Sequence, residues 1–73
     1  MRKFLVIEVV EGNRLGATYS TANYKAARKR FVDICMAYEK DETDRKIFFD
    51  AINGTEGEYN FGDGCFVTLT YSV

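Results

Sequence analysis

The 73-residue sequence contains no histidine, no proline and no tryptophan, and only two cysteines. Histidine is the side chain whose ordinary pKa lies closest to neutral pH, and it is the commonest metal ligand in proteins. Its absence weighs against acid–base catalysis and against a metal centre. We therefore expect no enzyme activity, no catalytic residues, no bound metal and no cofactor.

The two cysteines, Cys35 and Cys65, lie far apart in the sequence. Structural zinc sites take their ligands in closely spaced pairs, so this arrangement does not predict one. Unpaired cysteines are among the most frequently buried residues. We expect both thiols to be free and buried, as in the reducing cytoplasm.

Long hydrophobic runs are also absent. The apolar run Phe4–Val10 is interrupted by Glu8, is too short to cross a bilayer and is followed by no small-residue cleavage site. These features predict a cytoplasmic protein that does not engage a membrane. With 47% hydrophobic residues and no low-complexity tract, residues 1–73 are expected to form a single ordered domain.

Four segments have the composition of β-strands. Lys3–Val10 and Leu15–Ser20 are predicted to pair through a turn at Glu11–Arg14, because Gly and Asn accept the positive φ of hairpin turns. Ile47–Ile52 is rich in apolar and aromatic residues, and apolar and polar residues alternate in Cys65–Val73. These last two segments are predicted to form a second antiparallel pair.

A helix is predicted between the two pairs. Apolar residues recur there with a helical period, at Tyr24, Ala27, Phe31, Ile34, Cys35 and Tyr38. Ser20, Thr21 or Asn23 can cap the start of this helix, and its end is expected near Lys40.

The glycine-rich segment Asn53–Gly64 is expected to be a long excursion that contains a short strand at Glu58–Phe61. The expected fold class is therefore α+β. It consists of a single antiparallel sheet in the order β-β-α-β-β, with one amphipathic helix packed on one face.

The formal net charge of −1 hides an asymmetry along the chain. Residues 1–32 carry seven bases and two acids, whereas residues 39–63 carry eight acids and three bases. If the fold keeps these blocks apart, the molecule has one positive and one negative surface. A partner then contacts either the basic part of the helix or the acidic segment Glu39–Asp63.

The basic residues of the helix are unusual for their position. Lys25, Arg28 and Lys29 are spaced i, i+3 and i+4 in its first half, where like charges repel and the helix dipole disfavours cations. An unfavourable charge placement that nothing nearby offsets often marks a functional site. These three residues are therefore candidate binding residues. The other interpretation is a solvated face on which Lys29 pairs with Asp33.

Two apolar residues, Val32 and Met36, lie outside the predicted buried arc of the helix and beside the bases. Exposed apolar residues next to charges indicate a partner surface. The other interpretation, equally supported by the sequence, is that the buried stripe of the helix is wider than the predicted arc. Under the first interpretation Val32 and Met36 are candidate binding residues, as are the N-terminal bases Arg2 and Lys3.

The layout combines Lys3–Val10 running into a glycine turn, Ser20-Thr21 opening a helix that contains Ala26-Ala27 and Phe31, and a closing sheet. In this it resembles the very small proteins carried by phages and mobile elements, some of which are anti-CRISPR proteins or other inhibitors of host defence. The resemblance implies a non-enzymatic inhibitor or adaptor that docks on a larger host protein or nucleoprotein.

The alternative function is direct binding of nucleic acid. The bases that would carry it are Arg2, Lys3, Lys25, Arg28 and Lys29, with exposed aromatic rings stacking on the nucleic-acid bases. A pI near 5.3 is low for a dedicated nucleic-acid binder and weighs against this alternative. A homodimer formed through an open sheet edge is compatible with either function.

Overall fold

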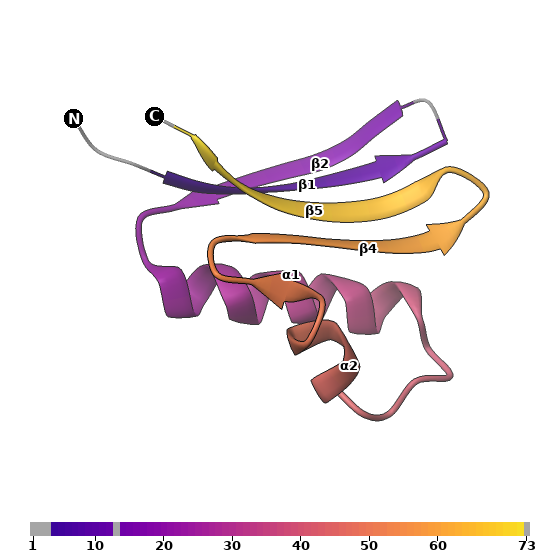
Figure 1. The fold of residues 1–73 in the computed structure, drawn as a ribbon. Coiled ribbons are helices and arrows are strands. Elements are labelled where there is room, and N and C mark those ends of the chain that lie inside the picture. The colour runs from indigo at the N-terminus through magenta and orange to yellow at the C-terminus, as the bar shows by residue number, and fades with distance from the viewer. Residues whose placement is uncertain (1–3, 13, 73) are drawn as a thin grey trace.

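The structure, a computed structural model, describes residues 4–12 and 14–72 (Figure 1). It is a five-stranded antiparallel sheet with one main helix, which confirms the predicted α+β class. The elements in chain order are β1 Phe4–Glu11, β2 Arg14–Thr21, α1 Tyr24–Tyr38, α2 Lys46–Phe49, β3 Ile52–Asn53, β4 Glu56–Gly62 and β5 Cys65–Ser72.

The strands lie in the order β2-β1-β5-β4-β3. β1 occupies the interior of the sheet, paired with β2 on one side and with β5 on the other. The predicted hairpin between β1 and β2 is confirmed, and Gly12 in its turn has a φ of 65°, a conformation that glycine adopts without steric cost. Lys3 and Val73, the outer ends of two predicted strands, lie outside the described residues.

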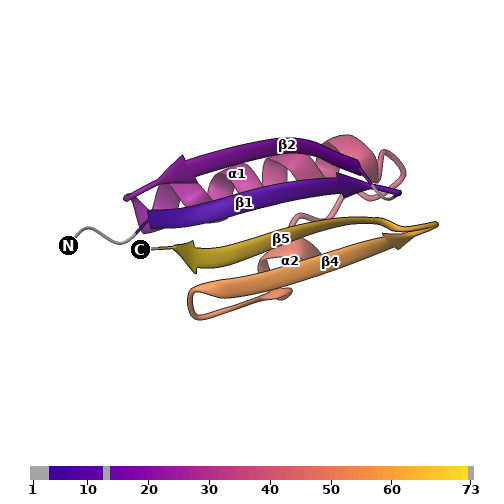
Figure 2. The ribbon, with the colours of Figure 1, turned by 90° about the horizontal axis from the view of Figure 1, so that it is seen from above.

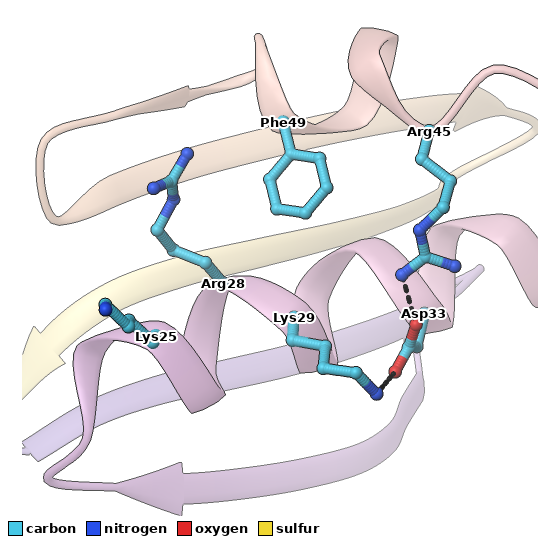
Figure 3. A pocket seen from close by; sticks show the side chains of 6 residues that line it. All are labelled: Lys25, Arg28, Lys29, Asp33, Arg45 and Phe49. Atoms are coloured by element: carbon cyan, nitrogen blue, oxygen red, sulfur yellow. Dashed lines mark hydrogen bonds and ion pairs between the residues drawn. The ribbon is translucent and has the colours of Figure 1, made fainter.

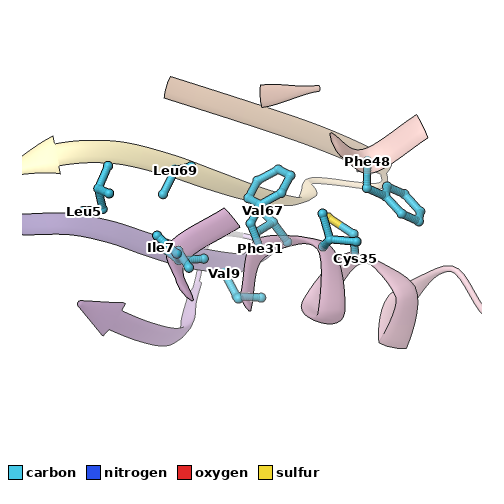
Figure 4. Close-up of a cluster of buried hydrophobic side chains, with 10 residues drawn as sticks. Leu5, Ile7, Val9, Phe31, Cys35, Phe48, Val67 and Leu69 are labelled. Carbon is cyan, nitrogen blue, oxygen red and sulfur yellow. The ribbon is translucent and has the colours of Figure 1, made fainter. Parts of the chain in front are cut away.

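Both helices cover the same face of the sheet, with α1 beneath β1 and β2 and α2 beneath β4 and β5 (Figure 2). Apolar residues of the sheet and of the helices meet in one core between these layers (Figure 4). The buried residues of this core are Leu5, Ile7, Val9, Ala27, Phe31, Val32, Cys35, Phe48, Val67 and Leu69.

α1 begins where the sequence supplies a cap. The Asn23 side chain accepts a hydrogen bond from the backbone N–H of Ala26 at 3.0 Å, and this satisfies a donor that has no partner within the helix. Asn23 is therefore the cap among the three predicted residues. The helix ends at Tyr38, close to the predicted end at Lys40.

The predicted strand at Ile47–Ile52 is wrong. Residues Lys46–Phe49 form a short helix instead, and only Ile52 belongs to a strand. The carboxylate of Asp44 accepts a hydrogen bond from the backbone N–H of Lys46 at 2.9 Å and starts the turn. Phe48 then reaches the core, where its ring meets Tyr59 edge-on at 4.8 Å between centroids.

The strand that pairs with β5 is β4, which includes the short strand predicted at Glu58–Phe61. The glycine-rich segment is thus mostly sheet. Its glycines mark the two ends of β4: Gly54 lies in the turn from β3, and Gly62 and Gly64 flank the turn into β5, all three with positive φ.

The buried face of α1 is centred differently from the prediction. Tyr24 and Tyr38, expected in the core, are each 38% exposed, whereas Val32 is completely buried. α2 packs beside α1 and covers a part of the helix that the sheet alone would leave open. The wider-stripe interpretation of Val32 is therefore correct, and Met36 is partly buried against the same core.

Candidate functional site

The outward side of α1 and the segment Arg45–Phe49, which includes α2, line an open pocket of ≈ 530 Å³, which we call the cationic pocket (Figure 3). Four basic residues, one acidic residue and one aromatic residue line it. They are Lys25, Arg28, Lys29, Asp33, Arg45 and Phe49.

Arg28 is held in place by aromatic rings. Its guanidinium carbon lies 5.5 Å from the centroid of the Tyr24 ring and 5.3 Å from that of Phe49. The Tyr24 ring is itself fixed, because its hydroxyl donates a hydrogen bond to the carbonyl of Gly54 in the β3–β4 turn. Such contacts limit the rotamers of Arg28. The Arg28 side chain therefore loses less conformational entropy when an anion binds to it.

The Nε atom of Arg28 is buried and has no hydrogen-bond partner among the described residues. A buried donor without a hydrogen-bond partner costs free energy of folding. Among the groups that line the cationic pocket, Arg28 is the one that carries this cost. An acceptor on a ligand that reached it would relieve this cost.

Asp33 joins the two helices. Its carboxylate forms an ion pair with Lys29 of α1 at 3.1 Å, one turn earlier in the helix, and another with Arg45 just before α2. The hydrogen bond from Arg45 is the main cause that lowers the pKa of Asp33, and Lys29 adds to it against the opposing effect of desolvation. Asp33 therefore stays ionised and neutralises part of the pocket.

Lys25 and Arg28 have no acidic partner within the described part of the chain. No acidic residue lies in the first turn of α1, so nothing there offsets these bases against the helix dipole. The cationic pocket thus holds four bases against one acid. An anionic group is the ligand class that this arrangement attracts.

The structure brings three of the candidate residues together in the pocket: Lys25, Arg28 and Lys29. Val32 is completely buried and has no surface to offer a partner, so its assignment as a binding residue is corrected. Met36 packs partly against the core. Arg2 and Lys3 lie outside the described residues.

Two pocket residues, Arg45 and Phe49, were missed by the sequence prediction, because Phe49 falls within the strand predicted at Ile47–Ile52 and Arg45 lies just before it. In helical geometry these residues are four apart and share one face. The spacing Arg45–Phe49 is the signal that would have placed them beside the helix bases.

Several carboxylates of the acidic segment Glu39–Asp63 have local partners. Glu42 accepts hydrogen bonds from the backbone N–H groups of Thr43 and Asp44, at 3.1 and 2.9 Å. Asp50 forms an ion pair with Lys46 at 3.0 Å. These acids have partners in the segment around α2, whereas Lys25 and Arg28 have no acidic partner among the described residues.

Other kinds of site find little support in residues 4–12 and 14–72. No group of three or more His, Cys, Asp or Glu side chains there could hold a metal ion. Both cysteines are free, and burial raises the pKa of the Cys35 thiol to about 12, so it is a poor nucleophile. Cys65, expected to be buried, is only partly so.

Neither helix in the described residues has the length and apolar character needed to cross a membrane. Comparison of the chain with protein families, with curated proteins and with solved structures finds no significant match. The cationic pocket is therefore interpreted from its own geometry and charge.

Proposed function

We propose that this chain is a non-enzymatic docking protein that binds an acidic surface of a larger protein through the cationic pocket. The observation that carries the proposal is the state of Arg28, which is fixed between two aromatic rings with an unpartnered, buried Nε, next to an unpaired Lys25. An arginine packed in this way is the kind of anchor that dominates binding energy at protein interfaces.

The shape of the cationic pocket supports a protein partner over a nucleic acid. Its four bases gather around one open pocket with Asp33 among them, rather than forming a stripe along a path that a backbone could follow. Tyr24, the exposed ring nearest to the unpaired bases, already packs under Arg28 and bonds to Gly54, which leaves it poorly placed to stack on a base. Carboxylates presented from one face of a folded partner suit a hollow of this kind.

The role we propose is stoichiometric inhibition or adaptation of the partner, as the resemblance to phage and mobile-element proteins implies. No group of the pocket combines a nucleophile with a base, so binding itself is its proposed activity. We place this activity in the cytoplasm, where the free Cys35 and Cys65 would remain reduced.

The test uses a helical peptide with Glu at successive i, i+4 positions, which presents a row of carboxylates and cannot join a sheet. We expect it to bind the wild-type protein. The double change Lys25→Gln and Arg28→Gln is expected to weaken binding about tenfold, from two charge contacts of about 0.5 to 1 kcal/mol each. Isothermal titration calorimetry gives both affinities.

The matched control is Lys46→Gln, which removes a base that lies outside the pocket and pairs with Asp50. It should leave the peptide affinity within about twofold of wild type. An equal loss in this control would mean that net charge, and not the cationic pocket, determines binding.

Duplex DNA is the second probe. If the partner is a nucleic acid, DNA will bind more tightly than the peptide, with a log–log salt slope of about −0.9 for each phosphate neutralised. The double variant will then flatten this slope, and the protein-docking proposal will be overturned.

A further inference from the structure

The edge strand β2 offers a second surface, separate from the cationic pocket. Seven of its eight residues pair with β1 on one side, and no described strand pairs with the other side. A strand in this position presents a row of backbone N–H and C=O groups to any extended chain that approaches. The register irregularity between Val9 and Val10 lies near its start and leaves the stretch 17–21 regular.

β2 has few of the features that protect natural sheet edges. Its sequence, RLGATYST, contains no proline and no lysine, and its single charge is Arg14 at the first position. The opposite edge is protected. β3 pairs with the start of β4, Asn60 accepts a hydrogen bond from the N–H of Gly62 at 2.7 Å, and the acids Glu56 and Glu58 lie along β4.

The charge next to Tyr19, in the regular part of β2, is positive. Arg30 of α1 reaches the helix-facing side of the strand, where its guanidinium carbon lies 4.9 Å from the centroid of the Tyr19 ring. Arg30 has no acidic partner among the described residues, since the nearby Asp33 pairs with Lys29 and Arg45. Thr18 and Ser20 project to the opposite side, as does Leu15, which is 61% exposed.

We propose that β2 accepts an extended, acidic segment of a partner protein as an added strand of the sheet. Backbone pairing to residues 17–21 supplies the binding energy, and an acidic side chain next to Arg30 supplies selectivity. Apolar side chains on the other side of the added strand contact Leu15. A second copy of this chain is a poorer occupant, because two β2 strands would bring the bases Arg14 and Arg30 of each copy together without an acid on either strand.

The probe is a short synthetic peptide in which Val and Glu alternate, compared with a matched peptide in which every Glu is Lys. We expect only the Glu peptide to bind. Its binding should shift the backbone amide signals of residues 17–21 in NMR spectra and slow their hydrogen exchange. Arg30→Gln should weaken binding about fivefold, and Arg30→Glu should weaken it further.

Arg45→Gln is the matched control, because it removes an arginine of the cationic pocket and leaves β2 unchanged. It should leave binding of the Val–Glu peptide within about twofold of wild type. This control separates the two sites, so that either proposal can fail without the other.

Four outcomes would overturn the β2 proposal: no binding of the Glu peptide, equal binding of both peptides, amide shifts confined to the cationic pocket, or an equal loss in Arg45→Gln. A stable dimer of the free protein with protected β2 amides would also overturn it, since the edge would then belong to a second copy.

Discussion

On the side of α1 that faces the sheet, Ala27, Phe31 and Cys35 are completely buried. On the side that faces α2 and solvent, Lys25, Arg28 and Lys29 line the cationic pocket. The inner face stabilises the fold through burial of apolar area, at about 25 cal/mol per Å². The outer face places cations at the end of the helix that repels them.

The difference between the two faces of α1 shows how one helix can both stabilise the fold and present a binding surface. Residues on the inner face are constrained by packing, so their identities are explained by the core. Lys25 on the outer face has no local explanation, and Arg28 has only a partial one in its two aromatic contacts. Changes to the two faces should therefore separate stability from binding.

The largest effect is expected from Phe31→Ala on the inner face. Phe31 is a large, fully buried side chain of the core, and its truncation leaves a cavity that costs about 3 to 5 kcal/mol. The Tm should fall by about 12 °C or more in thermal denaturation followed by circular dichroism. A Tm within about 2 °C of wild type would contradict the assigned inner face.

Val32→Ala should have the next largest effect, because this valine of α1 is completely buried in the core. The free energy of unfolding should fall by about 2 kcal/mol. Urea denaturation measures this loss. Where the variant is still folded, its affinity for the helical Glu peptide should match that of wild type within about twofold. A variant that is as stable as wild type but binds the peptide more weakly would contradict this prediction and would indicate that Val32 contacts the partner.

Changes on the outer face should alter stability much less. Arg28→Gln removes the contacts with Tyr24 and Phe49 and should cost about 0.5 to 1 kcal/mol. Lys25→Gln removes a cation from the first turn of α1 and should stabilise the protein by about 0.3 kcal/mol. Both are measured by urea denaturation, and a loss above about 2 kcal/mol in either would show that the outer face also supports the fold.

The smallest effect concerns Asp33 and depends on pH. Arg45 and Lys29 hold the pKa of Asp33 below its ordinary value of 3.8. The stability that this provides is present above a pH of about 4 and is lost as the pH falls through the lowered pKa of the folded state. Asp33→Asn should therefore be slightly less stable than wild type near neutral pH, and the difference should vanish in strong acid.

Urea midpoints of wild type and Asp33→Asn over a pH series would measure this. The effect is expected to be small because the Asp33 side chain is 40% exposed and its ion pairs are screened by solvent. A difference that grows as the pH falls would mean that the bridge between α1 and Arg45 does not stabilise the fold.

Local sequence signals were sufficient for the hairpin, for α1 and for β5, and they narrowed the cap of α1 to three residues that include Asn23. Gly12, Asn23 and the alternation of Val67 and Leu69 act within a few residues along the chain, and such signals are legible without a structure. They were insufficient for residues 46–49, whose apolar composition resembles a strand. The short helix there depends on Phe48 meeting Tyr59, a contact that the sequence does not reveal.

The candidate site was predicted only in part, because the sequence reveals spacing within one element but not contacts between separate elements. Lys25, Arg28 and Lys29 share one helix and could be grouped by their spacing. Arg45 and Phe49 come from a different element, so only the packing of α2 beside α1 brings them to the pocket. Val32, for which the helix pattern left both a surface and a core position open, is buried in the same core as Phe48 of α2.

The pairing of β1 with β5 has a consequence for synthesis of the chain. Phe4 pairs with Ser72 and Val10 with Phe66, so β1 must wait for β5, which is synthesised after all the other described elements. On the ribosome, the β1–β2 hairpin and α1 emerge while one edge of β1 is still unpaired and the core lacks Val67 and Leu69. The sheet therefore closes only after Cys65–Ser72 has left the exit tunnel, and such long-range pairing slows folding.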